Sequence, residues 1–291
     1  MGHKPASPLT DARVEASPEN LRKARVNQPR SVTRFDRAIV RAPARSVNAG
    51  LRASDCGAPT FEGIRDEHDT YVAALRAAGV EVMCLPPLEA FPDSIFVEDP
   101  ALVFTERAIL LRPGAPSRAG ETAELAPTLR EMFEVVLDLT GDGCADGGDV
   151  LTTPGHVMIG LSARTDRAGA EALQQALGKL GHESEIVATP PGVLHFKTDC
   201  SLLDDETILT TRRLSASGVF RRRLREILVP DGEEAAANAL RINDALFVGR
   251  EHPRTLDLLA EAGYQVVPLP TAEIGRIDAG MSCMSLRWRA A

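Results

Sequence analysis

The sequence predicts an α/β fold in which five similar units close into one array around a shared interior. Three observations lead to this prediction. Short apolar strands alternate with segments whose apolar residues follow the helical period. The order strand, helix, strand, turn, strand recurs about every fifty residues, as in repeat architectures. Each unit is too small to bury its own apolar face, so neighbouring units must share an interior. An ordinary doubly wound sheet is the alternative, and it explains helices between strands but not the recurring turn.

The first unit shows the pattern most fully. The strand Ala38–Pro43 precedes a helix expected over Arg65–Ala78, where apolar residues recur at helical spacing and Gly79 provides the stop. A second strand, Val80–Pro86, leads into an acid-bearing turn and a third strand within Asp93–Phe104.

The other four units repeat this order. Their helices are expected over Glu121–Phe133, Thr165–Leu180, Val219–Ile227 and Pro253–Ala262. Their opening strands are Ala108–Pro113, His156–Gly160, Thr207–Thr211 and Ala245–Gly249, and their second strands are Glu134–Leu139, Glu185–Ala188, Ala236–Ile242 and Tyr264–Pro268. A ring of such units places the turns together at one end of its axis, so we expect residues remote in sequence to meet there.

The chain divides into two regions of different character. Residues 1–34 are polar and proline-bearing without an apolar period, which predicts a disordered N-terminal arm. An arm that packs on a neighbouring subunit is the alternative. Residues 35–291 are expected to form a single domain.

Composition excludes several classes of partner. The 291 residues carry a formal net charge of -8 and only 4% aromatic residues, which argues against nucleic acid and favours a small cationic partner. The five cysteines are widely spaced without a Cys-x-x-Cys pair, as in a reducing compartment. The sequence contains no apolar run of about 18 residues and no secretion signal, so we expect a cytoplasmic protein with no membrane partner.

The expected turn residues include the parts of a nucleophilic site. The last turn, Asp278–Leu286, presents Cys283 after a glycine and a serine, at the mouth of a terminal strand. A thiolate is a strong nucleophile, although a buried, inert cysteine is the common alternative. His195 is the one histidine expected at a turn position, and its imidazole is suited to proton transfer. Asp146, before two glycines, fits an orienting acid, or else a simple Asp-Gly turn.

Further charged residues suggest the substrate. The remaining turn carboxylates are Asp93, Glu98, Asp99, Asp149 and Asp278. A ring of acids fits a cationic substrate, whereas a hard-metal site has no use for a central thiol. Arg118 and Arg164 close two loops at the expected edge of the site, where a guanidinium group can hold a carboxylate. Together these residues predict an amino-acid substrate with a cationic side chain.

At these residues the chain resembles the dimethylarginine dimethylaminohydrolases of the guanidine-modifying, or pentein, superfamily. The resemblance runs in order from about residue 36 to 288 and rests on Pro92–Asp99, Arg112–Arg118, Asp146–Leu151, Gly160–Thr165, Gly192–His195, and Asp278 five residues before Cys283. Each motif is moderately specific, and six in sequence are strongly specific.

The resemblance implies a five-bladed α/β propeller and a reaction without metal or cofactor. It implies Cys283 as nucleophile, His195 as acid and base, and Asp146 as the acidic partner of His195. The residues that match substrate-binding positions are Leu51, Asp93, Glu98, Asp99, Arg118, Arg164, Ile277 and Asp278. Leu51 belongs to a lid over Ser46–Glu62 that departs from the animal enzymes, which leaves the preference for N-methyl groups open.

The implied activity is hydrolysis of N-ω-methylated L-arginine to L-citrulline and an alkylamine through a covalent thiouronium on Cys283. An arginine deiminase or an amidinotransferase of the same superfamily is the nearest alternative. A non-catalytic arginine-binding protein is another, which the combination of thiol, imidazole and acid disfavours. The sequence leaves open whether the protein forms a homodimer.

Overall fold

The folded part of the chain contains five three-stranded sheets. The structure, a computed structural model, describes residues 31–290 apart from 53–56 and 221–222. Of the arm predicted over residues 1–34, residues 1–30 lie outside the described residues. The other four belong to the folded part, where the Thr33 carbonyl accepts the Asn243 N–H at 3.0 Å.

The first sheet joins the two ends of this folded part. Strand β1 (Arg37–Arg41) pairs in parallel with β2 (Glu81–Leu85) and antiparallel with β15 (Leu286–Trp288). The helix α2 (Phe61–Ala77) connects β1 to β2. The last strand of the chain therefore closes the array against the first.

The other four sheets have the same design, in which the middle strand pairs antiparallel with the strand before it and parallel with the strand after its helix. They contain β3 (Ala101–Phe104), β4 (Arg107–Leu110), α3 (Glu121–Met132) and β5 (Val135–Asp138); β6 (Val150–Thr152), β7 (Val157–Leu161), α4 (Arg167–Lys179) and β8 (Ser184–Ala188); β9 (Cys200–Leu202), β10 (Thr207–Thr210), α5 (Arg212–Ala216) and β11 (Arg225–Leu228); β12 (Leu240–Ile242), β13 (Ala245–Gly249), α6 (Pro253–Glu261) and β14 (Gln265–Leu269).

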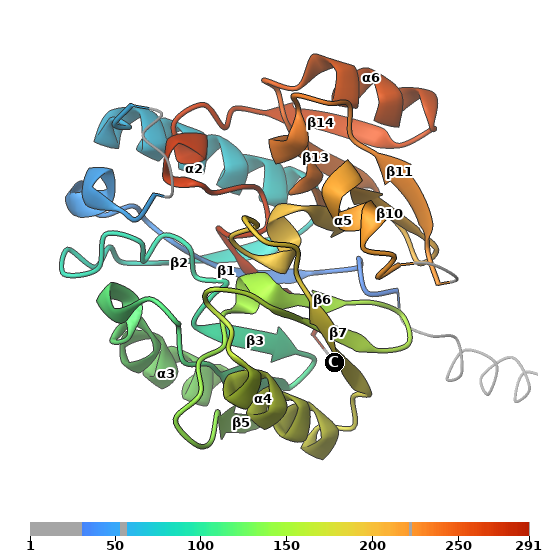
Figure 1. Ribbon diagram of the computed structural model, residues 1–291. Helices are drawn as coiled ribbons and strands as arrows, with labels where there is room; N and C mark the ends of the chain where they lie inside the picture. Colours follow the sequence, from blue (N-terminus) through green and yellow to red (C-terminus); the bar gives the residue numbers. More distant parts are fainter. Residues whose placement is uncertain (1–30, 53–56, 221–222, 291) are drawn as a thin grey trace, which may run out of the picture. The chain divides into compact units, whose positions relative to one another are not determined.

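These sheets surround a common centre, with the longer helices on the outside (Figure 1). The arrangement confirms the predicted closed array and the five-bladed α/β propeller, and the doubly wound alternative is wrong. One detail differs from the predicted unit. The third strand of each unit joins the sheet of the next unit, so every connection between sheets passes through one of the acid-bearing turns.

Helix α2 illustrates how the sequence sets these elements. The Thr60 side chain accepts the Gly63 N–H at 3.1 Å and caps the helix, which begins at Phe61, four residues before its predicted start. Tyr71 and Leu75 lie on the buried face, at 1% and 0% exposure. Gly79 adopts a φ of 86°, a left-handed conformation that is favourable for glycine and ends the helix.

The helix predicted over Val219–Ile227 is wrong for the residues that the structure describes, which leave out 221–222. The helix of this unit, α5, ends earlier, and Gly218 follows with a φ of 75°. The chain then forms β11, whose residues Arg225–Leu228 pair in parallel with Thr207–Thr210. The apolar spacing fits a helix locally, but pairing along β10 completes the sheet and outweighs that local preference.

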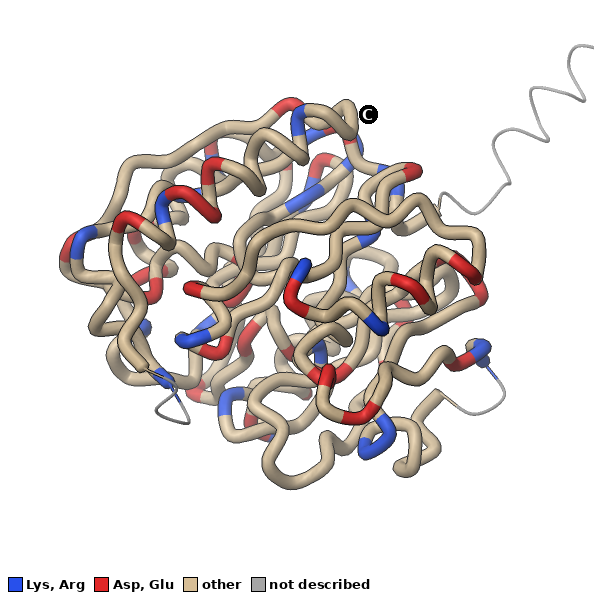
Figure 2. Tube along the Cα trace, turned by 90° about the horizontal axis from the view of Figure 1, so that it is seen from above, with Lys and Arg blue, Asp and Glu red and all other residues tan. Residues whose placement is uncertain are grey.

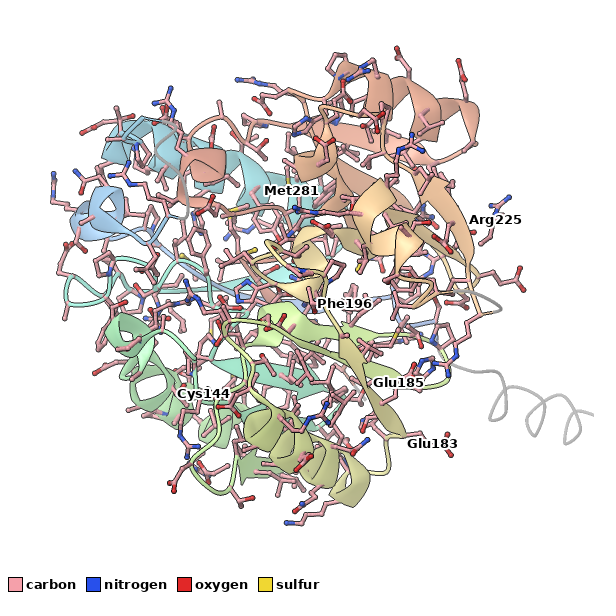
Figure 3. All side chains as sticks on the ribbon, in the orientation of Figure 1. Cys144, Glu183, Glu185, Phe196, Arg225 and Met281 are labelled. Carbon is pink, nitrogen blue, oxygen red and sulfur yellow. The ribbon has the colours of Figure 1, made fainter. Side chains whose placement is uncertain are left out.

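The interior is apolar, and charge lies mainly around it. Phe196 and Met281, at 0% and 1% exposure, lie where the sheets approach one another (Figure 3). Basic and acidic positions alternate around the described chain rather than gathering on one side (Figure 2). Among the described residues, no helix has both the length and the apolar character needed to cross a bilayer.

The closure by β15 leads to a stability prediction. Trp288 is 8% exposed and its ring centroid lies 5.0 Å from that of Phe133, which ends helix α3 of the neighbouring unit. Because truncating a buried tryptophan removes a large packed surface, Trp288→Ala should lower the free energy of unfolding by about 3 kcal/mol. Urea unfolding followed by circular dichroism measures this.

The matched control is Val135→Ala, at an apolar residue that is 39% exposed. Its effect should stay within about 0.5 kcal/mol. Equal effects of the two substitutions would contradict the role assigned to the closing strand.

Candidate active site

The acid-bearing turns of the first three units are joined by hydrogen bonds. The Gly147 N–H donates to the Asp99 carbonyl at 3.1 Å, and the Gly148 N–H donates to Asp99 Oδ1 at 2.9 Å. The Phe196 N–H donates to Asp149 Oδ1 at 2.8 Å. These bonds place the turn before β3, the turn before β6 and the turn before β9 side by side.

The last two turns join the same cluster. Asn238 lies before β12, and its carbonyl and Oδ1 accept the N–H groups of Met281 and Ser282 at 3.3 and 3.0 Å. The Glu98 N–H donates to the Cys283 carbonyl at 3.2 Å, which links the final turn back to the first. Residues that are remote in sequence therefore meet at one end of the array, as the repeat predicts.

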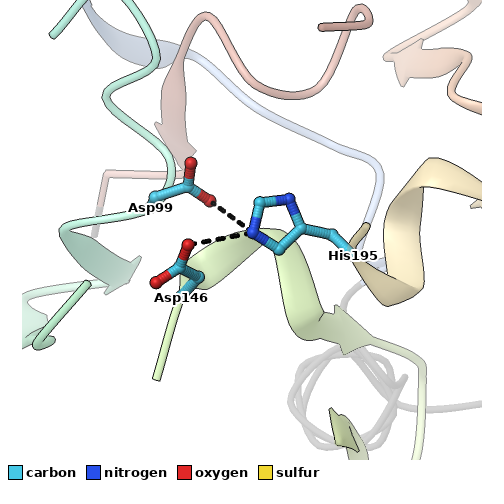
Figure 4. Close-up of side chains that lie close together, drawn as sticks. All are labelled: Asp99, Asp146 and His195. Atoms are coloured by element: carbon cyan, nitrogen blue, oxygen red, sulfur yellow. Dashed lines mark hydrogen bonds and ion pairs between the residues drawn. The ribbon is translucent and has the colours of Figure 1, made fainter. Parts of the chain in front are cut away.

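His195 and Asp146 are directly bonded at this end (Figure 4). The Nε2 atom of His195 lies 2.9 Å from Asp146 Oδ2. Asp146 is fully buried, and its Oδ1 accepts the Gly114 N–H at 2.7 Å. The carboxylate is thus held at both oxygens, and it orients the imidazole ring.

Asp99 is a second acid beside the same ring. Its Oδ1 lies 3.9 Å from His195 Nε2, and its Oδ2 pairs with Arg118. Burial opposes ionisation of Asp99, but the charges of His195 and Arg118 outweigh it and lower the pKa of Asp99 to about 2. Asp99 therefore carries its negative charge at neutral pH.

The acids in turn set the charge of the imidazole. Burial alone would lower the pKa of His195, but the Asp99 charge, the Asp146 hydrogen bond and the Asp149 charge together raise it to about 9. The ring is consequently an imidazolium at neutral pH, ready to donate a proton rather than to accept one.

Asp149 forms buried hydrogen bonds next to His195. It is fully buried, and its carboxylate accepts the hydroxyls of Ser162 and Thr165 at 2.6 and 2.7 Å besides the Phe196 N–H. Burial raises its pKa to about 6, against the effect of the His195 charge and these donors. From the sequence, Asp149 had no role beyond that of a turn carboxylate. In the structure Asp149 holds Phe196, the residue next to His195.

Cys283 retains partial exposure at the centre of the cluster. The Asn238 Nδ2 atom lies 3.7 Å from its Sγ atom. Burial and the nearby charges of Glu98 and Asp99 raise the pKa of the thiol to about 11, while the Gly280 N–H and Lys197 oppose this shift. In the unliganded protein the sulfur is therefore a neutral thiol at neutral pH.

Glu98 is surrounded by three donors from two other segments. It is 3% exposed, with Lys197 Nζ and Arg287 at 2.5 and 3.1 Å from Oε1, and the Ser282 hydroxyl at 2.9 Å from Oε2. Sequence reasoning missed the contributions of these three partners. Lys197 and Ser282 stand inside the quoted turns, two residues after His195 and one before Cys283, and that adjacency was the available signal.

The two arginines lie differently from one another. Arg118 was expected at the edge of a pocket, but it is buried at 3% exposure. Its guanidinium group donates to Glu121 at 2.9 and 2.7 Å and to the Phe96 carbonyl at 2.9 Å, in addition to Asp99. Glu121 draws it inward because a buried carboxylate needs a charged partner. Arg164 is half-buried, and its positive charge opposes the rise that burial causes in the pKa of Asp93.

Asp93 connects the site to the predicted lid. Its Oδ1 accepts the Leu51 N–H at 2.9 Å. Burial raises the pKa of Asp93, and the charge of Arg118, this N–H and Arg164 oppose the shift. The Leu51 side chain is 38% exposed, which suits a residue over the site rather than within the core. Part of the predicted lid, residues 53–56, lies outside the described residues.

The remaining predicted residues precede the turn that carries Cys283. Ile277 is 3% exposed and ends a 3₁₀ turn, Ile274–Ile277. Asp278 follows with a φ of 56°, a left-handed conformation that non-glycine residues seldom adopt. The backbone reverses there, so Asp278 is partly exposed beside the turn that carries Cys283.

One group of side chains has the composition of a metal site. Asp99, Asp146 and His195 each offer a ligand atom within 4.8 Å of the others. The bond of 2.9 Å between His195 Nε2 and Asp146 is hydrogen-bond geometry and already engages that nitrogen. A shared proton therefore accounts for the cluster.

Known proteins are similar to this chain in sequence over most of its length. The family described as N,N dimethylarginine dimethylhydrolase, eukaryotic, matches residues 58–188. The N(G),N(G)-dimethylarginine dimethylaminohydrolase of Pseudomonas aeruginosa is 36% identical over 255 residues, covering 87% of this chain and 100% of the relative. The enzyme of that name from Streptomyces coelicolor is 32% identical over 257 residues, covering 87% and 97%.

A solved structure shows the same fold. The Pseudomonas aeruginosa protein, as a cysteine-to-serine mutant complexed with citrulline, superposes with a TM-score of 0.84 at 36% identity. The match covers 87% of this chain and 99% of that one.

The charge on His195 can be tested directly. In the parent protein the imidazolium should persist until its pKa of about 9, and in Asp99→Asn it should lose its proton at least about one pH unit lower, since Asp99 is the largest raising influence. Nitrogen-detected NMR titration of the histidine rings measures both. The folded pKa of His195 exceeds its unfolded value of about 6.5. The contribution of the protonated ring to the free energy of unfolding is therefore complete below about pH 6.5 and is lost as the pH rises to about 9.

The control is Asp138→Asn, at a carboxylate whose side chain is 64% exposed and pairs with Arg130. It should leave the His195 titration unchanged. A His195 pKa near 6.5 in the parent protein would contradict the assigned charge.

Proposed function

Because the chain belongs to the dimethylarginine dimethylaminohydrolase family, we propose that it hydrolyses N-ω-methylated L-arginine. The products are L-citrulline and dimethylamine from asymmetric dimethylarginine, or methylamine from monomethylarginine. The observation that carries the proposal is the meeting of a thiol, an acid-paired imidazolium and buried carboxylates at one end of the ring. The substrate is a small cationic amino acid.

The carboxylates suit a planar cation. Asp93, Glu98 and Asp99 are buried at 5%, 3% and 4% exposure, and Asp278 lies beside the nucleophile turn. In a site with little water, such groups hold a guanidinium group more firmly than exposed acids do. Arg164 is the arginine available for the substrate carboxylate. Arg118, already bonded to two acids, supports Asp99 and keeps its substrate-binding assignment as a prediction.

Leu51 and Ile277 complete the proposed binding site. We assign Leu51 to covering the substrate, and the bond from its N–H to Asp93 supports this assignment. We assign the backbone near Ile277 to accepting a hydrogen bond from the substrate, and its position next to Asp278 supports this. Both assignments follow the family and are supported by these positions.

The first chemical step forms a covalent intermediate. The bound guanidinium group adds a positive charge beside the sulfur, which opposes the effect of Glu98 and Asp99, so that the thiol loses its proton to solvent and becomes the thiolate. Cys283 Sγ attacks the central guanidinium carbon, a C–S bond forms, and the C–N bond to the methylated nitrogen breaks. His195, as the imidazolium, protonates the departing amine, and Asp146 stabilises the ring during the transfer.

The second step reverses these roles. The neutral His195 removes a proton from water, and the resulting hydroxide attacks the thiouronium carbon. The C–S bond then breaks and the sulfur leaves as a thiolate, while the added hydroxyl gives up its proton to solvent and becomes the carbonyl of the ureido group of citrulline. The imidazolium formed in this step restores the starting charge, so no metal or cofactor enters the sequence of steps.

The setting of the protein is also a proposal. The described cysteines, Cys84, Cys144, Cys200 and Cys283, are all free thiols. Free thiols support a reducing compartment, and we propose the cytoplasm. A homodimer stays a prediction.

Turnover with defined substrates tests the function. Dimethylarginine and monomethylarginine should yield citrulline with a higher kcat/KM than arginine, and Cys283→Ser should lower kcat at least about 1,000-fold because the nucleophile is lost. Cys84→Ser is the control, since Cys84 is exposed in β2. A higher kcat/KM for arginine with release of ammonia would identify a deiminase, and tight binding without turnover would identify a binding protein.

The pH profile is a separate prediction. The reactive form needs a thiolate beside an imidazolium, although the thiol has a pKa of about 11 and His195 one of about 9. This inverted order leaves only a small fraction of the free enzyme in the reactive form, and kcat/KM should rise to a maximum above neutral pH. The acid limb of the kcat profile should lie at lower pH than that of the kcat/KM profile, because bound substrate favours the thiolate. A maximum of kcat/KM below pH 7 would contradict this.

A further inference from the structure

Asn238 contacts the nucleophile turn in three places. Its carbonyl accepts the Met281 N–H at 3.3 Å, its Oδ1 accepts the Ser282 N–H at 3.0 Å, and its Nδ2 lies 3.7 Å from Cys283 Sγ. The residue is 9% exposed and stands directly after the 3₁₀ turn Glu234–Ala237. Its side chain is therefore a buried bridge between the fourth and fifth units.

The contacts also fix the orientation of the amide. A backbone N–H can only donate, so the atom facing Ser282 must be the oxygen. The NH₂ group is then directed to the sulfur. Gly280 packs directly against this side chain, since a Cβ at position 280 would lie 2.4 Å from the Asn238 Cγ atom. A reversed amide would lose the Ser282 hydrogen bond and set its NH₂ group against that N–H.

The sulfur needs such a donor because its surroundings are acidic. Glu98 and Asp99 disfavour a thiolate at Cys283. A second lysine or arginine beside the sulfur would favour the thiolate but repel a cationic substrate. A neutral N–H group stabilises negative charge on sulfur without adding a positive charge to the site.

We propose that Asn238 is a catalytic residue, whose amide N–H stabilises the Cys283 thiolate while its oxygen fixes the turn that carries the sulfur. This rests on the proposed function, in which the sulfur is a thiolate twice: when it attacks the guanidinium carbon and when it leaves the thiouronium. Asn238 transfers no proton in either step. It lowers the barrier by holding the same donor beside the same atom in both directions of the C–S bond change.

The test exchanges the donor for an acceptor. Asn238→Asp keeps the size of the side chain and an oxygen for Ser282 but places an acid beside the sulfur. We expect alkylation of Cys283 by iodoacetamide at pH 8 to slow at least about 10-fold and its pH profile to move up by about one unit. Peptide mass analysis separates Cys283 from the other cysteines. With methylated arginine, kcat should fall at least about 10-fold, with KM changing less than about threefold.

Asn243→Asp is the matched control. The Asn243 amide donates to the carbonyls of Phe35 and Ala78 at 2.9 and 2.8 Å. The same chemical change there should lower the thermal unfolding temperature and leave the alkylation profile of Cys283 as in the parent. A shift of that profile in Asn243→Asp would show that any loss of stability alters the thiol, and would overturn the inference.

If Asn238→Asp does not fold, a second variant provides the test. Asn238→Ser removes the donor near the sulfur without adding charge, and it should slow alkylation and turnover by a smaller factor. Parent-like alkylation and kcat in either folded variant would overturn the role of Asn238. Because alkylation needs no substrate, this result is independent of the proposed function, which fails instead if Cys283→Ser retains full turnover.

Discussion

The structure depends on one constraint, that no unit can complete a sheet by itself. Each unit passes its last strand to the next sheet, and β15 pairs with β1, as in the register Ile39 to Leu286. Every passage between sheets therefore crosses the same end of the ring. The residues of the site are brought together by this connectivity, which explains why Asp99, Asp146, His195 and Cys283 meet although they are widely separated in sequence.

The electrostatics of the site follow from the choice of substrate. Carboxylates that suit a guanidinium group also favour a protonated imidazole and a neutral thiol, as the raised pKa values of His195 and Cys283 reflect. Without substrate, His195 is thus protonated and the Cys283 thiol is neutral. In the proposed mechanism a bound cationic substrate favours the thiolate, so the acids that disfavour it in the free protein link the reactivity of the sulfur to occupancy of the site.

Much of this could be predicted from the sequence, for reasons that also explain the failures. Glycine stops and helical spacing gave the limits of α2 within a few residues, because both signals are local. The helix expected over Val219–Ile227 failed because β10 supplies a pairing partner that no local pattern reveals. The inward position of Arg118 depends on Glu121, and the role of Asn238 depends on the fit of Gly280; both are tertiary contacts without a motif.

The basic residues near the site complete this account. Lys197 and Arg287 both pair with Glu98, and Arg118 pairs with Asp99, so these buried acids are partly neutralised before any substrate arrives. Without such partners, a cluster of buried carboxylates would disfavour the folded state. A guanidinium group must therefore compete with internal cations, and it gains only where its planar geometry meets oxygens that these cations leave accessible. Selectivity for one cation over another then rests on shape more than on charge.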